Sequence, residues 1–252
     1  MKLFRTLCLS SLMFVSIAAT SQQSMSEGSQ AHAVRATVVL LGTGTPIPDP
    51  DRSGPATAIV VGDSAYLVDF GPGVVRRAEA AVLDRGVTAL EPANLKIAFV
   101  THLHSDHTAG YSDLIFTGWT SGRNTPLEVY GPAGLNSMTE HILQAYRIDI
   151  ETRTNPEGNQ RVTADGWKVN AHEIKPGVIY KDANVTVTAF PTKHAMESYA
   201  IASIRLTAAS SSQVIQVLRR KQSKPVMGVM FWSTRRRCLS CTPRCPNAST
   251  RL

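Results

Sequence analysis

The chain has 252 residues, of which 43% are hydrophobic and 18% are charged, and its formal net charge is +7. This composition predicts a folded globular protein and argues against an intrinsically disordered one. The length suffices for one large α/β domain or for two small domains.

The N-terminus has the layout of an export signal. Lys2 and Arg5 precede an apolar stretch from Leu7 to Ala19, and small or polar residues follow. This stretch is too short for a comfortable membrane span. Residues 1–20 are therefore predicted to be a signal peptide of a secreted or periplasmic protein, which keeps no stable membrane span after cleavage. An uncleaved N-terminal anchor is the alternative.

From residue 36 onward, strand and helix patterns alternate. Strands are predicted in "ATVVLLGTG", in "TAIVVGDSAYLVDFG" with a turn at Gly62-Asp63, in "LKIAFVTH", in "LEVYGP" and in "WKVNAHEI". "VIYKDANVTVTAFPTKH" predicts a hairpin. Helices are predicted in "GVVRRAEAAVL", from His107 onward, and in "AGLNSMTEHILQAY", whereas residues 151–166 form a polar connection. This order predicts a mixed α/β fold.

The composition changes sharply after residue 200. Residues 201–252 contain ten Lys or Arg and no Asp or Glu, whereas residues 1–200 contain 16 basic and 19 acidic residues, a net charge of −3. The positive charge of the chain therefore belongs to this segment, which is rich in Ser, Arg and Cys and has one helix-like pattern near "SQVIQVLRRK". Cys238, Cys241 and Cys245 lack a fourth ligand at a suitable spacing, so we do not predict a zinc site there.

The segment "VTHLHSDHTAG", residues 100–110, has the composition of a metal site. In an extended segment His102 and His104 point to the same side and can bind one ion. Asp106 and His107 follow at the turn into a helix, where they can face a second ion. Histidine with carboxylate suits Zn²⁺, Mn²⁺ or Fe²⁺ better than Ca²⁺ or Mg²⁺, which prefer oxygen ligands.

This His-x-His-x-Asp-His run resembles the signature of the metallo-β-lactamase superfamily. "LGTGTP" at residues 41–46 and "LVDFGPG" at residues 67–73 further resemble its ribonuclease Z and arylsulfatase-like branch, and in particular the exported members. The resemblance covers residues 36–200. It implies an αββα sandwich with a dinuclear site at one edge between two sheets, and here a sandwich that is incomplete in its C-terminal half.

The resemblance also assigns roles to single residues. His102, His104 and His194 would hold the first metal, and Asp106 and His107 the second. Asp106 would also lie near the attacking water as a catalytic residue. Asp69 would be a buried aspartate that fixes the ligand loop. The implied cofactor is one or two zinc ions, with manganese or iron as alternatives.

Two adjacent cations would activate a water molecule for hydrolysis of a phosphodiester, sulfate ester, lactone or amide. The expected partner is a small-molecule or ester substrate. Export argues against nucleic acid, since the transfer RNA substrate of this branch is cytoplasmic. A homodimer is compatible with the sequence.

Two further parts of the family site are not visible in the sequence. The family supplies a bridging aspartate in an "SGDT"-like segment and a late histidine, but no histidine follows His194 and no acidic residue follows Glu197. A shift of reading frame near Ala200 would explain this, so residues 201–252 are predicted to be a basic tail outside the family pattern. The alternative is a divergent tail that binds anions.

Three hypotheses for the function result. The chain is a metallohydrolase by lineage whose activity is impaired, or a metal-binding protein without catalysis, or a module that binds polyanions through its Arg-rich tail.

Other candidate functional residues and motifs in the sequence are weaker. His141 and His172 are predicted to be structural, and "LGTGT" is predicted to form a tight turn, because a dinucleotide fingerprint would need glycine at Ile47.

Overall fold

The computed structural model describes residues 36–157, 162–205, 214–217 and 230–232. All of them belong to one compact unit, Ala33–Leu252. The predicted signal peptide at residues 1–20 and most of the predicted basic tail lie outside the described residues. Among the described helices, none is both long and apolar enough to cross a membrane.

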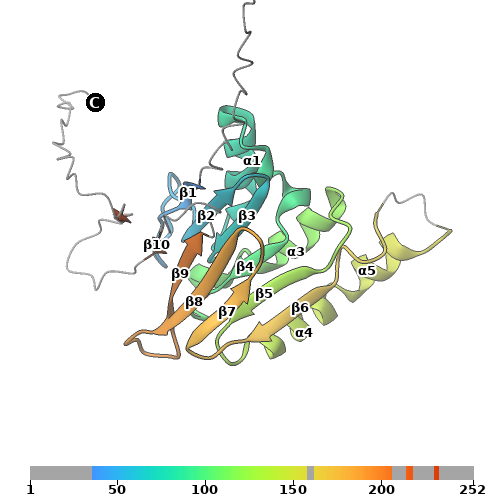
Figure 1. The fold of residues 1–252 in the computed structure, drawn as a ribbon. Helices are drawn as coiled ribbons and strands as arrows, with labels where there is room; N and C mark the ends of the chain where they lie inside the picture. Colours follow the sequence, from blue (N-terminus) through green and yellow to red (C-terminus); the bar gives the residue numbers. More distant parts are fainter. Residues whose placement is uncertain (1–35, 158–161, 206–213, 218–229, 233–252) are drawn as a thin grey trace, which may run out of the picture. The chain divides into compact units, whose positions relative to one another are not determined.

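The first sheet has six strands in chain order (Figure 1). They are β1 (Ala36–Gly42), β2 (Ala56–Val61), β3 (Ser64–Val68), β4 (Ile97–Phe99), β5 (Leu127–Gly131) and β6 (Val169–Glu173). The first three pair antiparallel, and the two-residue turn between β2 and β3 uses Gly62 at φ 58°. Strands β3 to β6 pair parallel, so the carboxyl ends of β3 and β4 meet at one edge.

The second sheet is antiparallel. It contains β7 (Gly177–Lys181), β8 (Val185–Pro191), β9 (Tyr199–Arg205), β10 (Val214–Val217) and β11 (Met230–Trp232), again in chain order. The described part of the chain after β6 contains strands and no helix.

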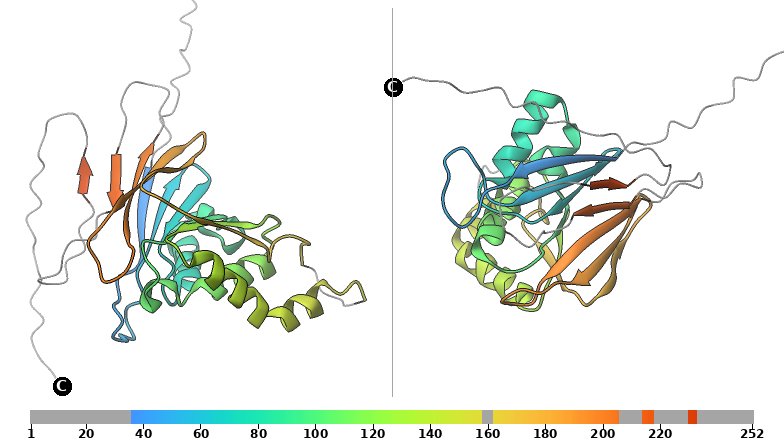
Figure 2. Two further views of the ribbon diagram at one scale, coloured as in Figure 1. Left: turned by 90° about the horizontal axis from the view of Figure 1, so that it is seen from below. Right: turned by 90° about the vertical axis from the view of Figure 1, so that its left-hand side faces the viewer.

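Helices precede the second sheet in the chain and pack on the first one (Figure 2). The longer ones are α1 (Val74–Arg85), α3 (Tyr111–Thr120), α4 (Leu135–Ala145) and α5 (Arg147–Thr154). Short ones are α2 (Ser105–Thr108), η1 (Thr88–Leu90) and η2 (Pro92–Asn94). The first sheet therefore lies between a helical layer and the second sheet.

This layering explains why β3 is apolar on both faces. Ala65 and Leu67 join the core beneath the helices, while Tyr66 and Val68 join the core between the two sheets. A strand that is buried on both faces loses the alternation of apolar and polar residues, as the run "AYLV" does. The mixed α/β fold is confirmed.

Two local predictions need correction. The helix-like pattern near "SQVIQVLRRK" is wrong at Val214–Val217, which form β10 and pair with β9. Val and Ile branch at Cβ and favour strands once a neighbouring edge is available. The polar connection was predicted to begin at Glu151, but α5 continues to Thr154.

Candidate metal centre

The segment that follows β4 carries the first two histidines. Val100 still donates its N–H to the Tyr130 carbonyl of β5 (2.8 Å), so the chain stays extended beyond the strand. His104 is also extended, at φ −65° and ψ 147°, and α2 begins directly after it. The chain therefore changes direction between the two pairs of predicted ligands.

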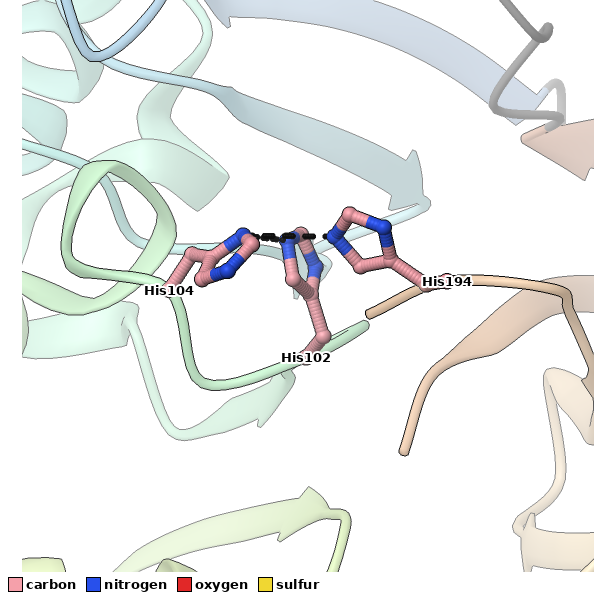
Figure 3. Close-up of side chains that lie close together, drawn as sticks. All are labelled: His102, His104 and His194. Atoms are coloured by element: carbon pink, nitrogen blue, oxygen red, sulfur yellow. Dashed lines mark hydrogen bonds between the residues drawn. The ribbon is translucent and has the colours of Figure 1, made fainter. Parts of the chain in front are cut away.

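Three histidine rings turn toward one another at this edge (Figure 3). His102 Nε2 lies 3.0 Å from His104 Nδ1, and His194 Nε2 lies 3.2 Å from the same atom. One nitrogen from each ring lies within 4.8 Å of the other two. The fold thus brings His194, from the segment after β8, to the two histidines that follow β4.

Asp106 and His107 lie beside this cluster and are buried. His107 Nε2 is 3.5 Å from Asp106 Oδ2, and the His107 ring centroid is 4.2 Å from that of His102. Among the described residues, the group whose ligand atoms all lie within 4.8 Å of one another contains His102, His104 and His194. Asp106 and His107, the predicted ligands of a second ion, lie next to this group but are not part of it.

Asp69 connects the histidine cluster with His107 through hydrogen bonds. Its carboxylate accepts hydrogen bonds from the Thr101 N–H (2.8 Å), the Thr101 hydroxyl (2.9 Å) and His107 Nδ1 (2.7 Å). A proton on His107 Nδ1 leaves Nε2 with its lone pair for a ligand. Thr101 Oγ1 is also 2.9 Å from His102 Nδ1, which leaves His102 Nε2 facing the other two histidines in the same way.

Sequence reasoning missed Thr101. The parallel pairing of Val68 with Phe99 ends β3 and β4 side by side, and Asp69, directly after β3, accepts hydrogen bonds from Thr101, which follows β4 by two residues. A hydroxyl residue immediately before His-x-His, opposite an aspartate that ends the neighbouring strand, was the signal available.

Glycines allow the loops around the site to pass close to one another. A Cβ atom on Gly71 would lie 2.4 Å from the Asp106 carbonyl oxygen, and one on Gly110 would lie 2.4 Å from the Gly71 carbonyl oxygen. In "LGTGT", a Cβ on Gly42 would lie 1.9 Å from the Gly54 carbonyl oxygen. These glycines therefore permit backbone contact between the loops. The tight turn predicted for "LGTGT" is not observed, because β1 continues to Gly42 and residues 43–45 form no turn.

The three imidazole nitrogens fit a zinc ion. Tetrahedral Zn²⁺ with bonds of about 2.0–2.1 Å places its ligand nitrogens about 3.3 Å apart. The separations of 3.0 Å for His102–His104 and 3.2 Å for His104–His194 are close to this spacing. Three protein ligands leave a fourth position for water or substrate, which is the usual arrangement of a catalytic rather than a structural zinc.

The chain thus combines a mixed α/β fold with a histidine cluster formed by residues that follow β4 of the first sheet and β8 of the second. A family model described as "Beta-lactamase superfamily domain" matches residues 65–238. The chain belongs to this family of metallo-β-lactamase-fold proteins, as its histidine motif indicated.

Relatives with enzyme names are similar to 160 residues of this chain. The ribonuclease Z of Mycobacterium marinum is 37% identical over 160 residues, which cover 62% of this chain and 54% of that protein. The ribonuclease Z of Mycobacterium bovis is 38% identical over the same length and covers the same shares. The chain therefore spans about half the length of the curated relatives it matches.

One solved structure supports the fold. Human tRNase Z, short form, superposes with a TM-score of 0.54 and 20% sequence identity, covering 73% of this chain and 68% of that one. At this identity the likeness bears on the fold alone.

Proposed function

We propose that this chain is a metal-dependent hydrolase of ester-type bonds that uses zinc, with phosphodiesters as its first candidate substrates. The observation that carries the proposal is the convergence of His102, His104 and His194 on one point, in a chain of the metallo-β-lactamase family. The relatives named ribonuclease Z favour phosphodiesters over sulfate esters and lactones. They also weigh against our expectation that nucleic acid is an unlikely substrate.

The residues of the site have separable tasks. His102, His104 and His194 would hold the ion. Asp69 keeps His102 oriented through the Thr101 hydroxyl and keeps His107 oriented directly. Zinc bound there would act as a Lewis acid and lower the pKa of its bound water to about 7. Asp106 lies next to His107 and is the carboxylate available to accept a proton from the attacking water.

A metal-binding protein without catalysis is the second candidate. Its support is the sequence after β8, which contains neither a further histidine beyond His194 nor an acidic residue beyond Glu197. We therefore expect at most one tightly bound ion per chain. We also propose that residues 1–20 are a signal peptide for export and that residues 201–252 form a basic tail.

Metal analysis of the purified 252-residue chain tests the centre. We expect about one zinc ion per chain, lost in His102→Ala and His194→Ala but retained in His141→Ala and His172→Ala, because those histidines lie outside the cluster. Two stoichiometric ions would contradict the single-ion expectation. Absence of zinc from the unsubstituted chain would refute the metal centre.

Hydrolysis assays then separate the candidates. A bis-aryl phosphodiester, an aryl sulfate and a lactone are offered to the zinc-loaded chain, with and without a chelator. Chelator-sensitive turnover of the phosphodiester supports the hydrolase. Stoichiometric zinc without turnover of any substrate supports the non-catalytic protein. Salt-dependent binding to heparin in the absence of zinc would favour the polyanion-binding alternative.

A further inference from the structure

The loop that carries His194 joins β8 to β9 and is closed at its base. Pro191 pairs with Tyr199 at the ends of the two strands. Next to this pair, the Thr192 N–H donates to the Ser198 carbonyl (2.9 Å), and the two hydroxyls are 2.6 Å apart. His194 itself is exposed. These contacts fix the base of the loop. The position of His194 in the loop therefore depends on contacts that the loop makes with other parts of the chain.

Glu197 provides such a contact with the first half of the chain. Its carboxylate accepts a hydrogen bond from the Tyr199 hydroxyl, and its other oxygen accepts one from the Ala133 N–H (3.3 Å). Tyr199 is 5% exposed, and its N–H donates to the Thr101 carbonyl (2.9 Å). The Glu197 carboxylate thus bonds to the hydroxyl of Tyr199, which is buried in β9, and to the backbone of the loop between β5 and α4.

That loop contacts the segment of the other two histidines. A Cβ atom on Gly134 would lie only 3.2 Å from Cδ1 of Leu103, the residue between His102 and His104. Leu103 in turn packs against the core beneath the helices. Glu197 therefore connects the loop of the third histidine, through residues 133 and 134, to the segment that presents the first two.

We propose that Glu197 is a positioning residue of the metal centre, because its carboxylate ties the His194 loop to the loop beside Leu103. It fixes His194 at the distance from His102 and His104 that one ion requires. This inference rests on the proposed zinc site. An exposed loop that is ordered in advance loses less conformational entropy when the ion binds, so the tie raises affinity without touching the metal.

Glu173 offers a matched control. It is also an exposed glutamate that accepts backbone hydrogen bonds from the same loop, from Gly134 (2.8 Å) and Asn136 (3.3 Å). It comes from β6, however, and has no tie to the His194 loop in these contacts. Loss of Glu173 should loosen the β5–α4 loop alone, whereas loss of Glu197 also releases His194.

The test compares zinc binding by the full chain and its variants, using competition with a chromophoric chelator. Glu197→Ala should weaken zinc binding by about tenfold, the lower end of the effect of outer partners of a metal site. Glu197→Gln should bind with intermediate affinity, because an amide oxygen can replace only part of the carboxylate's two bonds. Glu173→Gln should keep the affinity of the unsubstituted chain. Thermal melts of the zinc-free proteins measure the structural effect separately.

Cobalt substitution gives a geometric readout. The visible absorption of bound Co²⁺ should change in Glu197→Ala and stay unchanged in Glu173→Gln. Unchanged zinc affinity in Glu197→Ala, or equal losses of affinity in Glu197→Gln and Glu173→Gln, would overturn the inference while leaving the metal centre intact. A chain that binds no zinc before substitution would overturn the metal centre itself, and the inference with it.

Discussion

Asp69 is the residue on which most of the candidate site depends. It is the described non-glycine residue with a positive φ, 63°, and it is 7% exposed. Its N–H still bonds the Phe99 carbonyl (2.7 Å), so the chain leaves β3 in register and then turns. The left-handed turn directs the carboxylate toward Thr101 and His107. Asp adopts this backbone more readily than most residues, because its short polar side chain can bond locally.

Replacement of Asp69 separates its backbone role from its carboxylate role. Asp69→Asn tolerates the same backbone, but its amide group cannot accept bonds from both partners, so zinc affinity should fall about tenfold or more. Asp69→Ala should lose affinity similarly and also lose about 1 kcal/mol or more of unfolding free energy through backbone strain. Chelator competition and urea unfolding measure the two effects. Zinc affinity in Asp69→Asn equal to that of the unsubstituted chain would show that the carboxylate does not orient the ligands.

At the scale of elements, Arg123 fastens α3 to the loops around it. Its side chain is 1% exposed and donates to the carbonyls of Leu95, Leu114, Ile115 and Gly166 at 2.6 to 3.3 Å. Burial lowers the pKa of Arg123 to about 10, which leaves the guanidinium charged at neutral pH. A Cβ atom on Gly118 would lie 2.3 Å from Arg123 Nη1, so the glycine makes room for it.

Arg123→Met should destabilise the chain. The methionine fills part of the space but donates no hydrogen bonds, and each buried carbonyl left without a partner costs about 1–3 kcal/mol. We expect a loss of about 3 kcal/mol or more in the free energy of unfolding, measured by urea denaturation. Arg85→Met, at the exposed end of α1, is the control and should change it by less than about 0.5 kcal/mol. Similar losses in both variants would mean that the buried bonds are not important for stability.

These elements show which features a sequence can predict. His102 and His104 were predictable because alternation within one extended segment is local. His194 needed a family resemblance, since nothing near it in sequence distinguishes it from His141 or His172. Arg123 and Glu197 could not be predicted, because their partners are backbone groups that only the tertiary fold brings near. The β10 error has the same origin, since pairing with β9 decides between helix and strand there.

At the scale of the whole molecule, a polar cluster joins the two sheets at the start of β3, away from the metal centre at its end. Asp182, in the turn between β7 and β8, accepts hydrogen bonds from the hydroxyls of Tyr66 (2.6 Å) and Tyr180 (2.9 Å). Asn184 donates from its side chain to Ser64 (3.1 Å) and to Tyr66 (3.2 Å). The two sheets are thus connected at both ends of β8, by this cluster before the strand and by the histidines after it.

The titration of this cluster predicts how the two sheets respond to pH. Burial alone would raise the pKa of Asp182, but hydrogen bonds from Tyr66, from the Val185 and Asn184 N–H groups and from Tyr180 outweigh it, so the pKa lies below the ordinary value of 3.8. Burial and the bond to Asp182 raise the pKa of Tyr66 to about 12. The aspartate's stabilisation is therefore complete above pH 3.8 and is lost as the pH falls through its lowered pKa.

Asp182→Asn should remove this pH dependence. At neutral pH the variant should lose about 1–2 kcal/mol of unfolding free energy, since hydrogen bonds to a charged group are the stronger ones. The difference from the unsubstituted chain should stay constant at neutral and mildly acidic pH and shrink below 3.8, because protonation removes the same charge from Asp182. Urea unfolding at successive pH values measures it, with the exposed Asp63→Asn as a control that should follow the unsubstituted chain. A difference that persists unchanged into strong acid would show that the carboxylate charge does not hold the two sheets together.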